Sequence, residues 1–182
     1  MRSMFTIHAG EYLVGLHIQQ KLKLNVWIPA KDKGIDLLVT DRDNRRTVSV
    51  QAKYGKDFLP GQSTALQESL SCFSWFTLNR TNLRDSQAEL WVFVLHSFNS
   101  KPHFVVIPKA ELHRRMTSLH RTEKTLQIYL CSTRRSKRCW EIRGLGHDPS
   151  QIKEGVRKEP LRDFSKYLNA KGWAALTKKL KV

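Results

Sequence analysis

The chain has 182 residues, of which 40% are hydrophobic and 26% charged, and this composition suits one folded domain with an apolar core. No apolar run approaches the roughly 18 residues that a membrane span needs, and we expect no signal peptide. Lys and Arg total 32 against 16 acidic residues, which gives a net charge of +16. That excess favours nucleic acid as the partner. An anionic membrane surface, the alternative, would need a basic amphipathic helix or a lipidation motif.

The cysteines give a second global indication. Cys72, Cys131 and Cys139 show no CxxC pairing and no metal-ligand spacing. Their odd number and scattered positions predict a reducing, cytoplasmic setting and no structural zinc. We expect this setting to be the cytoplasm of a bacterium or archaeon.

In chain order, the first predicted element is a helix over residues 5–24, because Ile7, Val14 and Ile18 recur at helical spacing. Glu11 falls on this apolar stripe, where an acid is costly unless it is paired or binds a cation. Later apolar runs predict strands around residues 26–28, 34–39, 48–54, 90–95, 104–107, 126–130 and 139–142. Helices are expected over residues 108–119 and 161–180, a helix followed by a strand over 63–78, and a surface loop over 149–158.

This order of elements predicts a mixed α/β fold with a central β-sheet flanked by helices. The core is expected to include the tryptophans that lie among apolar neighbours, Trp75, Trp91, Trp140 and Trp173.

Three polar residues stand out on two adjacent predicted strands. Asp36 lies on the first, and Gln51 and Lys53 lie on the second, after a polar turn over residues 41–46. Gln51 and Lys53 share one face because side chains alternate along a strand. If Asp36 pairs onto that face, Asp36 and the Gln51 side-chain oxygen can hold a divalent cation. Lys53 can then meet the charge of a phosphate or orient a water.

The arrangement resembles the PD-(D/E)XK (restriction-endonuclease-like) nuclease superfamily, in Glu11 of the first helix, Asp36 in Gly-Ile-Asp-Leu-Leu-Val, and Gln51-Ala52-Lys53. The usual acid of the third strand is Gln51 here, as in Mrr-type restriction endonucleases, and Ile35 replaces the leading proline. The resemblance covers about residues 5–108. We expect residues 109–182 to extend the same single domain, 1–182.

The resemblance implies a DNA endonuclease of restriction or homing type that depends on Mg²⁺, with Mn²⁺ as the other candidate ion. Its catalytic residues would be Glu11, Asp36, Gln51 and Lys53, and its metal ligands Asp36, Gln51 and Glu11. Because cutting both strands needs two such sites, a homodimer or higher homo-oligomer is expected. A non-catalytic nucleic-acid-binding protein of the same fold and a branched-DNA (Holliday junction) resolvase are the alternatives, and RNA stays open as a substrate.

Several basic clusters could contact nucleic-acid phosphates. The turn over residues 133–138 is the preferred contact because it concentrates four cations. The predicted nucleic-acid-binding residues are Arg134, Arg135, Lys137, Arg138, Arg114 and Arg115.

Overall fold

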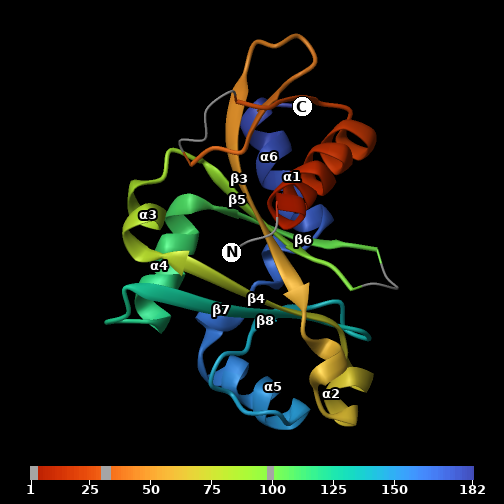
Figure 1. The fold of residues 1–182 in the computed structure, drawn as a ribbon, viewed down its shortest axis with the longest axis vertical. Helices are drawn as coiled ribbons and strands as arrows, with labels where there is room; N and C mark the ends of the chain where they lie inside the picture. Colours follow the sequence, from red (N-terminus) through yellow and green to blue (C-terminus); the bar gives the residue numbers. More distant parts are fainter. Residues whose placement is uncertain (1–3, 30–33, 98–100) are drawn as a thin grey trace.

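The computed structural model describes residues 4–29, 34–97 and 101–182, and it is a mixed α/β fold in which helices flank a predominantly antiparallel open sheet (Figure 1). The mixed α/β layout with helices flanking a central sheet, predicted from the sequence, is therefore confirmed. No helix in these ranges is long and apolar enough to cross a membrane.

One part of the sheet follows the first helix. α1 (Met4–His17) continues into a short π-helix (Ile18–Leu22) and leads to an antiparallel meander of β1 (Asn25–Trp27), β2 (Leu37–Thr40) and β3 (Thr47–Asp57). Then α3 (Arg80–Asp85) precedes β5 (Leu90–Leu95), which runs parallel to β3, and β6 (His103–Pro108) pairs antiparallel with β5. β3 is therefore a central strand of this part, between β2 and β5.

β3 also belongs to a second part of the sheet. Its last residues pair with β4 (Leu70–Asn79), so that Lys56 lies opposite Trp75, and β4 continues to β7 (Thr125–Thr133) and β8 (Cys139–Glu141). At Gly55 the two strands come so close that a Cβ atom would lie 2.7 Å from the Phe76 ring. A glycine is thus needed where β3 passes from one part to the other.

Alternating side chains explain why the strand over residues 90–95 is hydrophobic throughout. Trp91 and Phe93 face β4 and β7 in one apolar cluster, whereas Val92 and Val94 face α1 and α6 (Ala170–Leu180) in another. α4 (Lys109–Leu119) adds side chains to the first cluster, and α2 (Thr64–Ser69) and α5 (Pro149–Lys158) lie beyond the second part of the sheet (Figure 1). Both faces of β5 are therefore buried, as in a central strand covered on each side.

The structure corrects two sequence predictions near the C-terminus. Residues 149–158 form the helix α5 rather than a loop: the Asp148 side chain accepts hydrogen bonds from the N–H groups of Ser150 and Gln151, an N-cap that Pro149 follows. The helix expected over 161–180 begins only at Ala170, after the 3₁₀ turns Pro160–Arg162 and Ser165–Tyr167.

β8 carries a fully buried acid. The carboxylate of Glu141 forms an ion pair with Arg162 and accepts a hydrogen bond from the N–H of Arg143, at 3.1 Å. Burial raises the pKa of Glu141 to about 7, against the opposing effect of the Arg162 charge.

Candidate active site

Asp36 lies directly across the hairpin from Gln51. The residue immediately precedes β2, and its N–H donates to the carbonyl of Val50 at 3.0 Å. Its carboxylate oxygen Oδ2 accepts two hydrogen bonds from β3, one from the N–H of Ala52 at 2.7 Å and one from the side-chain amide of Gln51. The structure thus brings Asp36 and Gln51 together, which is the condition on which the predicted cation site depended.

Lys53 follows Gln51 on the same face of β3. Its Nζ lies 5.8 Å from the centre of the Trp91 ring, within reach of a cation–π interaction. Gln51 and Lys53 line a groove of about 720 Å³, which we call the Lys53 groove. The other residues that line it come from the end of β4, from α3 and its flanks, and from neighbouring strands: Gly34, Thr77, Leu78, Asn79, Asn82, Asp85, Ser86, Trp91 and Thr125.

The groove opens where β3 and β4 diverge. Beyond the pairing of Lys56 with Trp75, β4 keeps its hydrogen bonds to β7 but has no described pairing with β3. Thr77 and Asn79 of β4 line the same groove as Gln51 and Lys53 of β3. Asp36 is joined to this lining through its hydrogen bond with Gln51.

Glu11 lies on a helix that covers the opposite face of β3. The neighbouring Gly10 packs so tightly on Tyr54 that a Cβ atom there would lie 2.9 Å from the Cβ of Tyr54, whose side chain points away from that of Lys53. Glu11 is half-buried and is not among the described residues that line the Lys53 groove. Its role as a second carboxylate ligand therefore stays a prediction.

The site offers oxygen ligands of the kind that Mg²⁺ prefers. Asp36 contributes a carboxylate, and Gln51, which donates its amide nitrogen to Asp36, retains Oε1 as an acceptor. Within the described ranges, no group of three or more His, Cys, Asp or Glu side chains could hold a metal ion. This small oxygen set is of the kind that Mg²⁺ accepts, since Mg²⁺ often binds one or two protein carboxylates and keeps several waters.

The predicted phosphate contacts fall into two groups. Those in the turn between β7 and β8 are all exposed: Arg134, Arg135, Lys137 and Arg138. Arg114 is exposed as well, but both its Nε and Nη2 donate to Glu111, at 2.9 and 2.8 Å. In the turn, Arg134 donates to the carbonyl of Gln67 at 3.1 Å, and Arg138 lies 3.9 Å from the carboxylate of Asp163.

Arg115 does not fit the predicted phosphate contact. It is only 5% exposed, and its guanidinium donates to the Glu111 carboxylate and to the carbonyls of Leu161 and Asp163. These bonds fix α4 to the segment before α6, so Arg115 acts inside the fold rather than on a ligand.

The sequence prediction missed an aromatic pocket on the far side of β4. Trp75 was expected in the core but is 41% exposed, whereas Trp91 and Trp173 are buried as expected. Alternation along β4 could have predicted this exposure, because Trp75 shares a face with Phe73 and Thr77, whereas Phe76 and Leu78 lie on the opposite, core-facing side.

Comparisons of the chain with protein-family models, with curated proteins and with solved structures find no match. The function therefore has to be inferred from the chemistry of the site.

Proposed function

We propose that the protein is a metal-dependent DNA endonuclease of the restriction-endonuclease-like fold. The observation that carries the proposal is the cluster on β3: Asp36 accepts hydrogen bonds from Gln51 and Ala52, and Lys53 projects from the same strand face into the adjoining groove. A carboxylate, an amide oxygen and a lysine beside an open groove are what metal-assisted phosphodiester hydrolysis requires.

The order of elements supports the fold assignment. The nuclease core resembled by the sequence consists of a helix, three antiparallel strands, a helix and a further strand. α1, β1, β2, β3, α3 and β5 follow this order, and β5 is parallel to β3. The strand β4 is then an insertion between β3 and α3, and it forms the second wall of the Lys53 groove.

Each residue has a distinct part in the proposed reaction. Asp36 would be the principal ligand of Mg²⁺, or Mn²⁺, with Gln51 Oε1 as a second ligand and Glu11 as the predicted third. The bound cation would supply Lewis-acid stabilisation of the charge that develops on the phosphate. Lys53 would place its ammonium group against a phosphate oxygen and orient the attacking water. The N–H of Ala52 holds Asp36 in place during these steps.

DNA is the proposed substrate because of the charge distribution. The net charge of +16 and the exposed turn over residues 133–138 supply phosphate contacts that do not depend on sequence. Cleavage of both strands would require a second copy of the site, so we propose a homodimer or a higher homo-oligomer as the active form.

The test is cleavage of supercoiled plasmid by the purified protein with Mg²⁺, with Mn²⁺ and with EDTA. Asp36→Ala and Lys53→Ala should each abolish metal-dependent nicking, because one removes the main ligand and the other the phosphate partner. Asp43→Ala and Lys171→Ala are the matched controls, since both change an exposed charge away from the groove and should cut as the wild type does. Wild-type cutting by Lys53→Ala would refute the site.

One observation favours a non-catalytic nucleic-acid-binding protein as the second candidate. The position of the usual third-strand acid is occupied by Gln51, which donates to Asp36 rather than adding a negative charge. A binding protein would retard the plasmid in a salt-sensitive way in every lane, without metal dependence and without cutting. Four-way junctions compared with linear duplex would separate a resolvase from a restriction-type enzyme.

A further inference from the structure

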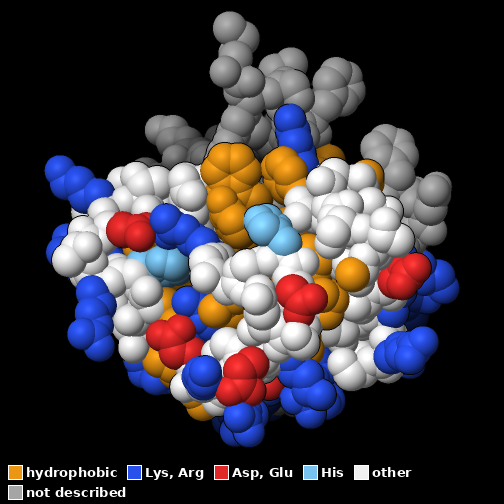
Figure 2. All heavy atoms as spheres, turned by 90° about the horizontal axis from the view of Figure 1, so that it is seen from below, with side chains coloured by type: hydrophobic (Ala, Val, Ile, Leu, Met, Phe, Trp, Pro, Cys, Tyr) orange, Lys and Arg blue, Asp and Glu red, His pale blue; other side chains and the backbone are white. Residues whose placement is uncertain are grey.

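A second cavity, which we call the aromatic pocket, lies on the outer face of β4 and β7. Its volume is about 380 Å³, within the range of small-molecule sites. Hydrophobic side chains are exposed near the centre of this face beside a histidine, and Lys and Arg side chains surround them, with several acids among them (Figure 2). The pocket is lined by residues of β4 and β7, of the segment after β3 and of the loop before α5, among them Trp75, Tyr129, Gln62 and His147.

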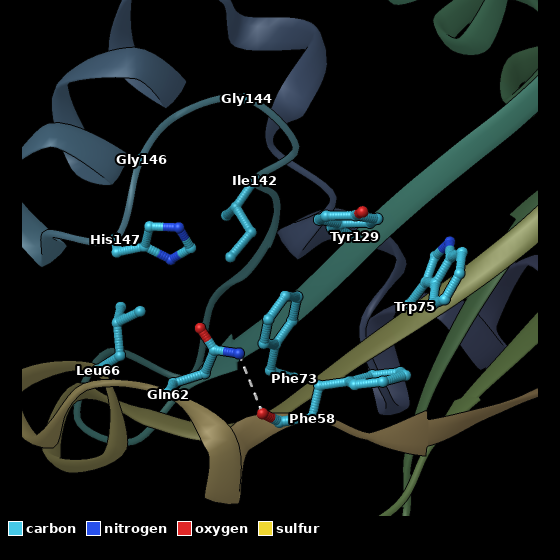
Figure 3. A pocket seen from close by; sticks show the side chains of 10 residues that line it. All are labelled: Phe58, Gln62, Leu66, Phe73, Trp75, Tyr129, Ile142, Gly144, Gly146 and His147. Atoms are coloured by element: carbon cyan, nitrogen blue, oxygen red, sulfur yellow. Dashed lines mark hydrogen bonds between the residues drawn. The ribbon is translucent and has the colours of Figure 1, made fainter.

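Aromatic rings make one wall of the pocket (Figure 3). The centre of the Trp75 ring lies 5.8 Å from that of Phe58 and 6.2 Å from that of Tyr129, and Phe73 lies 5.9 Å from Tyr129. All three pairs are tilted or edge-on, so the rings do not cover one another's faces. With Trp75 41% exposed, the wall offers ring faces on which a flat ligand can stack.

The opposite wall supplies hydrogen-bonding groups and little bulk. Gln62 donates its side-chain amide to the carbonyl of Phe58 at 3.2 Å, which turns its carbonyl oxygen toward the cavity, and His147 faces Gln62 from the loop (Figure 3). Gly144 and Gly146 have φ values of +76° and +84°, and a Cβ atom at Gly144 would meet nothing within 4 Å. Stacking faces beside donors and acceptors suit a planar heteroaromatic ring better than an aliphatic chain.

The aromatic pocket and the Lys53 groove lie along the same two strands. On β3, Lys53 lines the groove, and Phe58, just beyond the strand end, lines the pocket; on β4, Thr77 lines the groove and Trp75 the pocket. At about 3.3 Å per residue, Lys53 and Phe58 are separated by roughly 17 Å along the chain. Lys56 pairs with Trp75 and shares its face, so the pocket lies on the opposite side of these strands from Lys53, and a nucleic-acid strand that occupies both sites has to pass from one side to the other.

Basic residues lie near this path. Lys56, which is exposed, is paired with Trp75 where β3 meets β4. The side chain of Arg134 donates to the carbonyl of Gln67, whose own amide donates to the carbonyl of Gln62 in the pocket wall, at 3.1 and 2.8 Å. The pocket thus lies in basic surroundings, which favour a nucleotide over an uncharged aromatic compound.

We propose that the aromatic pocket holds an unstacked nucleobase of a DNA strand bound along β3 and β4. The inference rests on the proposed function and specifies its substrate: the nuclease would prefer DNA with unpaired nucleotides to an intact duplex. A base that stacks on Trp75 and Tyr129 would bring its neighbouring phosphates close to Lys56, which pairs with Trp75.

The test is binding of short single-stranded DNA in EDTA, so that no cleavage is needed. Fluorescence anisotropy would compare labelled oligothymidylate with an oligonucleotide of the same length made of abasic sugar-phosphates. The wild type should bind the abasic strand about tenfold more weakly, and Trp75→Ala should bind oligothymidylate about tenfold more weakly than the wild type. Trp75→Phe should retain most of the affinity, and Trp27→Ala, which removes another exposed tryptophan, should retain all of it.

The abasic strand separates stacking from a structural role. Trp75→Ala should bind it as well as the wild type does, because no base remains to stack. The proposal would be overturned if Trp75→Ala lost the same affinity for the abasic oligonucleotide as for oligothymidylate, or if it lost no affinity for oligothymidylate. The second result is expected if the pocket accepts an apolar side chain of a protein instead. The binding assay contains no metal, so it is independent of cleavage. Base-dependent binding without metal-dependent cutting of either plasmid or single-stranded DNA would refute the nuclease and leave the pocket proposal intact. Metal-dependent cutting without base-dependent binding would refute the pocket proposal and leave the nuclease intact.

Discussion

Replacement of Gln51 by Glu tests the contact on which the proposed active site depends. Gln51 is 6% exposed and donates its amide to Oδ2 of Asp36. Glu has the same shape but replaces this donor with a second carboxylate oxygen. In the absence of a cation, two carboxylates would then face each other in a position with little access to water, and one of them would have to take up a proton or move away.

The expected size follows from the geometry. Two unit charges about 4 Å apart repel each other by ~4 kcal/mol at the effective dielectric constant of ~20 that suits such sites, and partial protonation reduces this to about 2–4 kcal/mol. For a chain of 182 residues, each kcal/mol shifts Tm by roughly 2–4 °C, so Gln51→Glu should melt about 5–15 °C below the wild type in EDTA. Mg²⁺ should restore most of this loss, because a bound cation offsets the repulsion.

The assay is thermal unfolding followed by circular dichroism, in EDTA and across a Mg²⁺ titration. Gln19→Glu is the matched control, since it changes the charge equally at an exposed position. If Gln51→Glu melts together with Gln19→Glu in EDTA, the contact between Gln51 and Asp36 is not as described. If Gln51→Glu is destabilised in EDTA but Mg²⁺ raises its Tm no more than that of the wild type, the pair does not hold a cation.

Three further predictions follow from other parts of the fold. Gly55→Ala should lower the free energy of unfolding by about 1–3 kcal/mol in urea titrations, because the added Cβ would lie 2.7 Å from the Phe76 ring; an unchanged value would contradict the close crossing of β3 and β4. The pKa of Glu141 is raised from 4.5 to about 7, so between these pH values the folded state binds more protons than the unfolded state. The free energy of unfolding should therefore fall by up to ~3 kcal/mol as the pH rises from 4.5 to about 7. Urea unfolding at several pH values should show this fall in the wild type and not in Glu141→Gln. Replacing Arg134 and Arg135 with Ala should reduce the slope of log affinity against log salt by about 1 per residue in gel-shift titrations, and an unchanged slope would exclude the turn as a phosphate contact.

The sequence predicted best those elements whose pattern depends on local rules. The hairpin of β2 and β3 was predicted from its polar turn and alternating residues, and this register alone places Asp36 opposite Gln51. β5 was predicted from its uninterrupted apolar run. In both cases, whether a face of the strand is buried or exposed determines the residue types found on that face.

The errors arose where tertiary contacts decide the outcome. α5 was missed because only Ile152 and Val156 are buried on it, too few for a helical stripe to show in a polar segment. Arg115 has the same residue type as its exposed neighbour Arg114, so its burial follows from where α4 packs and not from the local pattern. The side of the sheet on which α1 packs, and with it the position of Glu11, likewise depends on close approach at Gly10.

The sharing of β3 between the two parts of the sheet has a consequence for how the molecule unfolds. β5 pairs with the middle of the strand, residues 50–55, and β4 pairs with its end, so neither part keeps its full set of pairings if β3 detaches. The parts should therefore lose protection from hydrogen exchange together, as one cooperative unit, although their outer helices lie on opposite sides of the molecule. A ligand bound only in the Lys53 groove would then slow amide exchange as far away as β7 and β8.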